Sequence, residues 1–107
     1  MPKYLVAGSY TAEGAKGLLA EGGTARRAAT EKLLASAGAT LEAYYFALGS
    51  DDFYIIADVP GGKTAVAAAA LTASASGAVR TRTIVLLTPE EVDAASKVSL
   101  TYRAPGA

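Results

Sequence analysis

The sequence contains no cysteine and no histidine, and these two absences exclude more chemistry than any motif in it suggests. Without cysteine there is no disulfide, no thiol nucleophile and no thiolate metal site. Without histidine the chain lacks the usual general base at neutral pH and the usual zinc ligand. Ser-His-Asp, Cys-His and zinc-hydrolase mechanisms are therefore excluded. We expect no metal site and no cofactor, so any catalysis would depend on Asp, Glu, Tyr, Arg or Lys, or on a borrowed cofactor.

The sequence also lacks an excess of either charge. Ten basic and ten acidic residues give a net charge of zero, whereas a nucleic-acid partner would favour a basic stripe. No apolar stretch approaches the roughly 20 residues that cross a bilayer, and the first residues do not have the profile of a signal peptide. We therefore expect neither nucleic acid nor membrane as a partner, and a cytoplasmic location.

Large apolar side chains are scarce. The hydrophobic fraction is 51%, but 25 of the 107 residues are alanine and only 23 are Leu, Ile, Val or Phe. A chain of this length forms one domain, which we place at residues 1–102, with a frayed tail at 103–107. The core should be thin, so a second subunit could supply the missing burial. The alternative is a monomer of ordinary marginal stability.

The first third of the chain reads as a strand followed by an interrupted helix. Lys3–Ser9 is short and apolar, and Thr11 is a suitable N-cap for a helix that ends near Ala20. Gly22-Gly23 interrupts this helix. Thr24 can cap a second helical piece, residues 25–37, which Gly38 would end in a left-handed conformation. The glycine pair lacks the context of a phosphate-binding loop.

The middle of the chain, residues 40–59, reads as a β-hairpin. A two-residue loop at Ser50-Asp51 pairs Phe46 with Ile55, although a three- or four-residue turn is also open. The apolar face should then meet the helices: Tyr44, Phe46, Leu48, Phe53, Ile55 and Ala57. The other face mixes aromatic and acidic side chains and should point away: Ala43, Tyr45, Ala47, Asp52, Tyr54, Ile56 and Asp58.

The last third contains a helix, a strand and a second helix. Residues 64–76 are Ala-rich and uncharged, so this helix is either covered on its outer side or simply an exposed Ala-rich helix. Residues 78–87 read as a strand. Thr88-Pro89-Glu90-Glu91 has the pattern of a capping box with proline at the first helical position, and it predicts a helix to about Tyr102.

This order, β-α-β-β-α-β with a C-terminal helix, predicts an α+β, ferredoxin-like fold. Its four-stranded antiparallel sheet would carry helices on one face only. The other face, which we call the open face, includes Tyr45, Tyr54 and Ile56 and is too aromatic to be left in water without a reason. We expect a homodimer that packs two open faces together around a pocket.

Segments along nearly the whole chain resemble the GYD-domain family: KYLVAGSYTAEGAKGLLAEG, GGTARRAATEKL, LEAYYFALGSDD, SGAVRTRT and LLTPEEVDAA. The resemblance implies a fold similar to the dimeric α+β barrel proteins, and most members of the family have no established activity. The family is named for a Gly-x-Tyr-Asp pattern at the hairpin. Gly49 and Asp52 match this pattern, Asp51 stands at the tyrosine position, and Arg80 is a further matching position.

The candidate ligand-binding residues are Asp52, Arg80, Arg82, Tyr45, Tyr54 and Asp58. Arg80 and Arg82 share a strand face about 7 Å apart. They either hold a ligand carboxylate or enolate oxygen or protect an edge strand from pairing. Asp58 either pairs with an arginine across the sheet or ends its strand.

Other residues have simpler interpretations. We interpret Asp51 as a turn residue and Gly49 as the supplier of a backbone conformation that the turn needs. Tyrosines are more often core or interface residues than catalysts.

Three functions remain open. The first is a homodimer that binds a small organic molecule between its sheet and helices or at its open face. The second is a cofactor-independent enzyme that performs oxygenation, isomerisation or proton abstraction. In that enzyme Asp52 or Asp58 would be the base and Arg80 would stabilise an oxyanion. The third is a structural or interaction module without catalysis.

Overall fold

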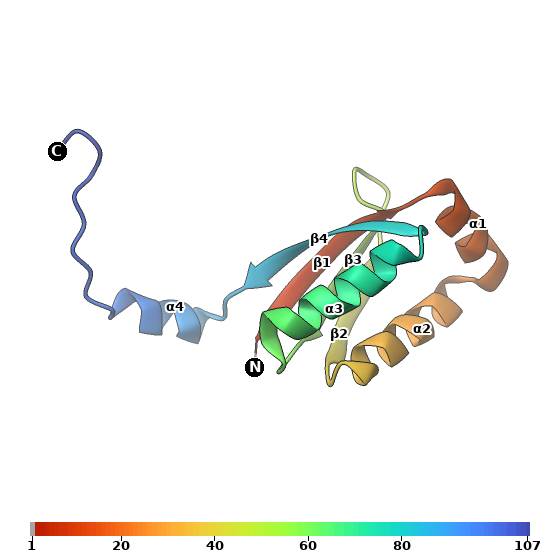
Figure 1. The fold of residues 1–107 in the computed structure, drawn as a ribbon, viewed down its shortest axis with the longest axis horizontal. Coiled ribbons are helices and arrows are strands. Elements are labelled where there is room, and N and C mark those ends of the chain that lie inside the picture. The colour runs from red at the N-terminus through yellow and green to blue at the C-terminus, as the bar shows by residue number, and fades with distance from the viewer. Residues whose placement is uncertain (1) are drawn as a thin grey trace.

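The computed structural model describes residues 2–107 and shows a four-stranded antiparallel sheet with helices on one face (Figure 1). The strands lie in the order β2-β3-β1-β4. This arrangement confirms the predicted ferredoxin-like α+β fold. The elements are β1 (Lys3–Tyr10), α1 (Ala12–Glu21), α2 (Gly23–Ser36), β2 (Thr40–Phe46), β3 (Phe53–Asp58), α3 (Gly62–Ala75), β4 (Val79–Leu86) and α4 (Pro89–Ser96).

The break between α1 and α2 lies where the glycine pair predicts it. Thr11 caps α1 by accepting a hydrogen bond from the Gly14 backbone N–H at 3.2 Å. Gly22 then turns the chain with φ at 85° and is itself the N-cap of α2. The prediction that Thr24 caps this helix is wrong, because the helix has already begun at Gly23. A side chain at Gly23 would press on the ring of Phe46, since an added Cβ would lie 3.0 Å from it.

The hairpin has a longer loop than the two-residue turn predicted from the sequence. Phe46 pairs with Phe53, and the Ala47 backbone N–H donates to the Asp52 carbonyl at 2.8 Å. The predicted register is therefore wrong by two residues. A shift of two leaves every paired side chain on its predicted face. Leu48 is the exception, because it lies in the loop and is fully exposed.

Phe53 fixes β3 in this register. Its ring centroid lies 5.2 Å from that of Tyr10 and 6.1 Å from that of Tyr44. The ring also covers Gly8 of β1, where an added Cβ would lie 2.5 Å from it. Only glycine permits this approach. Contacts between three strands therefore determine the pairing, and the turn residues alone do not reveal it.

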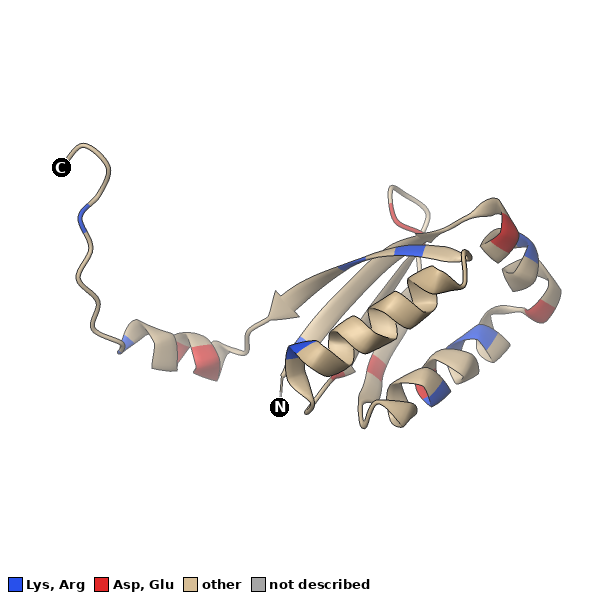
Figure 2. Ribbon diagram, viewed as in Figure 1, with Lys and Arg blue, Asp and Glu red and all other residues tan. Residues whose placement is uncertain are grey.

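The core is thin, as the composition predicts. The buried apolar residues include three alanines, and none of them comes from a helix: Tyr4, Ala7, Ala39, Phe53, Ile55, Ala57 and Val59. The α3 helix begins two residues before the predicted start and therefore includes Lys63. Beyond that first turn it carries no charge (Figure 2). Its Leu71 is 70% exposed, so within this chain the outer side of α3 is uncovered.

The C-terminal helix is shorter than predicted. The predicted capping box at Thr88 and Glu91 is present, but α4 ends at Ser96 rather than near Tyr102. Val98, Thr101 and Tyr102 have lower helix propensity than the Glu and Ala residues of α4, and the Ser96 hydroxyl donates to the Asp93 carbonyl at 2.7 Å. Residues 97–107 form no helix or strand. Among the described residues, no helix is both long and apolar enough to cross a membrane.

Residues 87–107, which we call the arm, lead away from the rest of the molecule (Figure 1). Every residue from Pro89 to Ala107 is exposed. The radius of gyration is 16.9 Å, whereas a compact chain of this length has about 13 Å. The arm is therefore not packed on its own domain.

Candidate functional site

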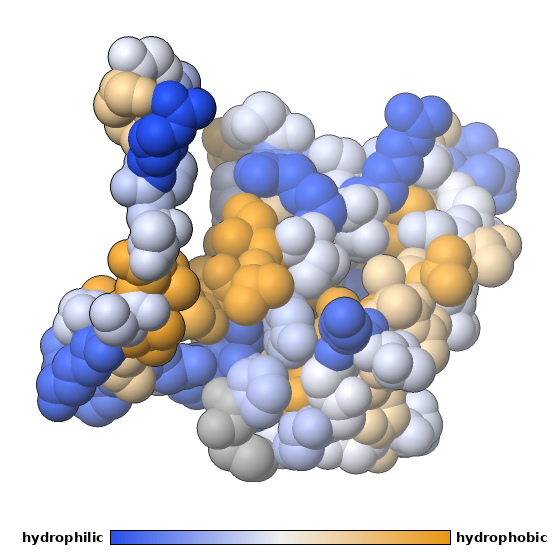
Figure 3. All heavy atoms as spheres, turned by 60° about the vertical axis from the view of Figure 1, so that its left-hand side comes forward, coloured by the Kyte–Doolittle hydropathy of each residue, from blue (hydrophilic) through white to orange (hydrophobic). Residues whose placement is uncertain are grey.

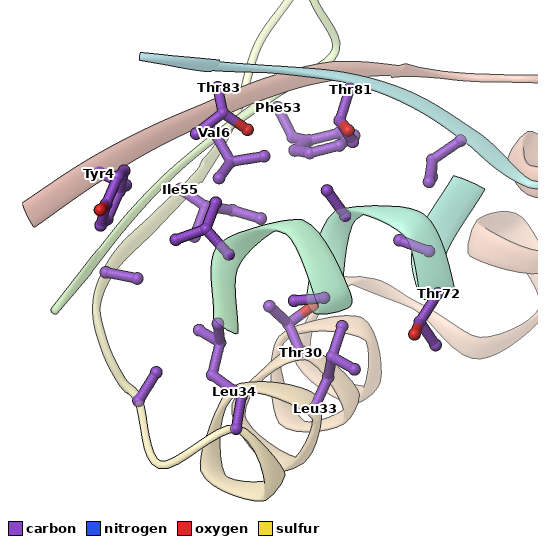
Figure 4. Close-up of a pocket in the computed structure, with 18 of the residues that line it drawn as sticks. Tyr4, Val6, Thr30, Leu33, Leu34, Phe53, Ile55, Thr72, Thr81 and Thr83 are labelled. Atoms are coloured by element: carbon purple, nitrogen blue, oxygen red, sulfur yellow. The ribbon is translucent and has the colours of Figure 1, made fainter. Parts of the chain in front are cut away.

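A cavity of about 260 Å³ lies between the sheet and helices α2 and α3 (Figure 4). Its floor is the helix face of the sheet, and its roof consists of Leu33 and Leu34 of α2 and several alanines of α3. Alanine side chains are too short to fill the space between helix and sheet. Apolar cavities of about 150 Å³ hold benzene, so this cavity has room for a single-ring or short branched molecule.

The walls of the cavity are mainly apolar, with a few hydroxyls. Val6, Phe53 and Ile55 of the sheet face it, and Thr81 and Thr83 of β4 extend toward it (Figure 4). The hydroxyls of Thr30 and Thr72 are already bonded to carbonyls of their own helices. An apolar ligand with one polar group matches such a lining better than a highly polar one.

The polar end of the cavity contains Tyr10, Tyr44 and Arg26. The two tyrosine hydroxyls lie 3.0 Å apart and share a hydrogen bond. Burial, together with this hydrogen bond to Tyr44, raises the pKa of Tyr10 above its ordinary value. The phenol therefore stays neutral at physiological pH. Arg26 pairs with Glu21 at 3.5 Å, and a guanidinium has further N–H donors for a second partner.

The predicted candidate residues lie elsewhere, and they do not form one site. On the open face, Arg82 Nη2 donates to Asp51 Oδ2 at 2.7 Å, and the Tyr54 hydroxyl donates to the same oxygen at 3.3 Å. We call these three residues the Asp51 cluster. Tyr54 and Arg82 are the two cross-strand neighbours of Ala7, whose exposed fraction is 0%. On the open face, the Asp51 cluster therefore covers Ala7 in the middle of β1.

Asp51 is more than the turn residue that the sequence suggests. It is the one buried charged residue among those described, with 8% of its surface exposed. The hydrogen bond from Arg82 holds the pKa of the Asp51 carboxyl below its usual range, and the same contact raises the pKa of Arg82. Asp51 thus anchors the hairpin loop to β4.

Asp52 and Gly49 have local roles. Asp52 Oδ2 accepts a hydrogen bond from the Tyr10 backbone N–H at 2.9 Å, and the Asp52 N–H donates to the Gly8 carbonyl at 2.7 Å. Both bonds tie the loop to β1. Gly49 is exposed, does not have a positive φ, and has open space where a side chain would lie. The prediction that Gly49 supplies a special turn conformation is therefore wrong.

The remaining candidates occupy the other parts of the open face. Asp58 pairs with Lys3 at 2.9 Å, not with an arginine, and Lys3 also pairs with Glu42 at 3.0 Å. Arg80 is exposed on the edge strand β4, beside Ser9 of β1. Tyr45 is 71% exposed on β2, opposite Tyr54. The structure thus brings Tyr54 and Arg82 together, places Tyr45 beside Tyr54 on the next strand, and leaves Asp52, Asp58 and Arg80 apart from them.

Sequence reasoning missed the cavity residues Tyr10, Tyr44 and Arg26. A signal for one of them was present, because Tyr44 falls on the hairpin face assigned to the helix side. The contact between Tyr10 and Tyr44 depends on the pairing of both β1 and β2 with β3, and the sequence alone does not predict the register of this pairing.

Comparison with known proteins supports one family. The model of the GYD domain matches residues 4–106 of the 107-residue chain. No curated protein and no solved structure matches the chain. The match covers all four strands and all four helices described above except the first residue of β1. The chain therefore belongs to the GYD-domain family.

Proposed function

We propose that this protein is a cytoplasmic homodimer that binds a small organic molecule in the cavity between its sheet and helices. The observation that carries the proposal is the combination of an apolar cavity of about 260 Å³ with a polar group at one end. Pockets with mainly apolar walls and a few convergent polar groups are the usual form of small-molecule sites.

The polar end favours a ligand with an acidic or hydrogen-bond-accepting group. Arg26 is a cation at the cavity wall, and because the hydroxyls of Tyr10 and Tyr44 share one hydrogen bond, one of the two keeps a hydrogen that it can donate. A carboxylate or phenol oxygen would accept from these groups by charge-assisted hydrogen bonds. We therefore propose a ligand with one aromatic ring or a short branched chain and a single carboxylate.

Binding is better supported than catalysis. Asp52 and Asp58 were the candidate bases, but the first accepts a backbone hydrogen bond and the second is held by Lys3. Neither lines the cavity, and Arg80 does not line it either. The proposed ligand therefore lies on the opposite side of the sheet from Asp52, Asp58 and Arg80, the three residues on which the enzyme hypothesis depends.

The homodimer is supported by the open face. Tyr45 and Ile84 are exposed there, and Leu5 and Ile56 are only half-buried between them. An apolar patch of this kind on one face of a sheet usually marks an interface. A second copy would bring the same patch, as a two-fold interface requires.

Calorimetric titration with sodium benzoate, with toluene as a neutral probe of similar size, tests the cavity. Ala69→Met places a larger side chain in the cavity, whereas Ala67→Met adds the same side chain on the exposed side of α3. We expect the first variant to lose benzoate and the second to bind it like the parent. Equal binding by both variants would contradict the proposal.

The charge preference is tested by a second matched pair. Arg26→Gln removes the cation at the cavity, whereas Arg27→Gln removes a neighbouring cation that pairs with Glu31 on the surface. We expect only Arg26→Gln to weaken benzoate, by roughly tenfold, with little effect on toluene. Native mass spectrometry of the purified protein checks the homodimer.

A further inference from the structure

The arm carries apolar side chains that nothing in its own chain covers. Val92, Val98, Leu100 and Tyr102 are each more than half exposed, and Leu100 reaches 83%. Figure 3 shows hydrophobic side chains on the arm and on the surface of the domain beside it. Apolar side chains that are exposed together in this way usually mark a surface that binds a partner.

The sequence of the arm beyond α4 has the pattern of a strand. In Val98–Arg103 the apolar residues Val98, Leu100 and Tyr102 alternate with Ser99, Thr101 and Arg103. Alternation with a period of two, in residues of high β propensity, is typical of a half-buried strand. Yet the segment pairs with no strand of its own chain.

The sheet offers a free edge that suits such a strand. β4 is an edge strand, so the outer backbone groups of Val79–Leu86 are unpaired within the sheet. Its second half, Thr83–Leu86, is uncharged, and both Ile84 and Val85 are exposed. Free, uncharged edges readily accept an added strand. The other edge strand, β2, is less suitable because its pairing shifts at a bulge.

In the structure the arm does not reach this edge within one chain (Figure 1). The connection Leu87–Lys97 has 11 residues, of which Pro89–Ser96 form α4. A crossover to a parallel neighbouring strand needs a dozen residues or more, whereas an antiparallel return needs a turn, and here the helix α4 stands in place of that turn. Moreover, α4 leads away from β4, so that Val98–Arg103 lies beyond the end of the sheet (Figure 1). A second copy can present its edge there without this constraint.

We infer that Val98–Arg103 of one copy adds as a fifth strand to the free edge of β4 in a second copy, at Thr83–Leu86. In a two-fold dimer the exchange is reciprocal, so that each sheet gains a strand from its partner. Val98, Leu100 and Tyr102 then cover one face of the extended edge. The inference rests on the proposed homodimer, and it names the segment that joins the two copies.

Cross-linking between two differently sized chains tests the exchange directly. The chain has no cysteine, so each engineered thiol is unique. Thr83→Cys is introduced in the untagged chain and Thr101→Cys in a chain lengthened by an affinity tag. The two are mixed and treated with a short bis-maleimide. We expect a covalent heterodimer on a denaturing gel, and clearly less product when Ser36→Cys at the end of α2 replaces Thr83→Cys.

Cross-linking of Thr83→Cys no better than that of Ser36→Cys would overturn the inference. So would a chain that carries both Thr83→Cys and Thr101→Cys and cross-links only within itself, because the arm would then dock on its own domain.

A pair of variants tests the apolar face of the added strand. Leu100→Asp places a charge on that face, whereas Ser99→Asp places it on the alternate face. We expect sedimentation equilibrium to show roughly 10- to 100-fold weaker dimerisation for Leu100→Asp and little change for Ser99→Asp.

Two outcomes separate this inference from the homodimer itself. A dimer that is equally stable with Leu100→Asp and Ser99→Asp would overturn the arm exchange and leave the homodimer standing. A parent protein that is monomeric at every concentration would contradict both.

Discussion

The hydroxyls of Tyr10 on β1 and Tyr44 on β2 meet at 3.0 Å across the intervening strand β3. The two side chains come from strands that are not neighbours, and Phe53 lies between them with its ring against both. The three rings form the end wall of the cavity. Their contact links the pairing of the sheet to the chemistry of the site.

Tyr10 should resist ionisation. Because the pKa of Tyr10 is raised in the folded protein, the neutral phenol favours folding below the ordinary tyrosine pKa of about 10, and this contribution is lost as the pH rises above it. We expect a spectrophotometric titration to show one tyrosine that ionises later than the others. Tyr10→Phe should remove that late step. Tyr45→Phe, which changes an exposed tyrosine, should leave it in place.

Breaking the Asp51–Arg82 pair should release the hairpin loop. We expect Asp51→Asn to lower the melting temperature at pH 7 and to speed amide exchange in the loop. Because the pKa of Asp51 is lowered in the folded state, its contribution is complete above about pH 4 and is lost as the pH falls further. The parent and Asp51→Asn should therefore differ at neutral pH and converge in acid. A constant difference down to pH 2 would contradict the role of this ion pair.

Gly8 should be intolerant of a side chain. A Cβ there would lie 2.5 Å from both the Arg80 carbonyl oxygen and the Phe53 ring. We expect Gly8→Ala to lower the free energy of unfolding by about 1–3 kcal/mol in denaturant titrations. Gly17→Ala in α1 is the matched control, since nothing lies within 4 Å of its added Cβ. It should be neutral or should stabilise by up to about 1 kcal/mol. Equal effects at the two positions would refute the close packing of β1.

The capping box should control α4 without affecting the domain. Thr88 accepts from the Glu91 backbone N–H at 3.1 Å, and Glu91 accepts from the Thr88 N–H at 2.9 Å. We expect Thr88→Ala to reduce the helical chemical shifts of α4 and to leave the unfolding midpoint of the domain unchanged. The bonds from Thr88 lower the pKa of Glu91, so acid below about pH 4 should have the same effect as the substitution.

Much of the fold could be predicted because its signals are local. Thr11, Gly38 and the Thr88 capping box each act on the backbone within four residues, and all three are found where the sequence places them. The alternation of β3 likewise depends only on the period of a strand, and Phe53, Ile55 and Ala57 are buried as expected.

The hairpin loop and the cavity depend on long-range contacts, and these could not be predicted. Asp51 contacts Arg82, 31 residues away, and this pair draws the loop residue out of a tight turn. The cavity depends on how closely α3 approaches the sheet. Alanine content indicates that a helix can come close, but the cavity is also lined by Phe53, Leu33 and Leu34, which belong to other elements.

The alanines of α3 that line the cavity have one more consequence. Ala65, Ala69 and Ala73 present only a methyl group to the space. Replacing any one of them by a larger residue would shrink that space by a side chain's volume and leave the main chain where it is. The size of molecule that fits the cavity can therefore change through single substitutions in α3. We expect differences in ligand preference between related proteins to arise first from this helix.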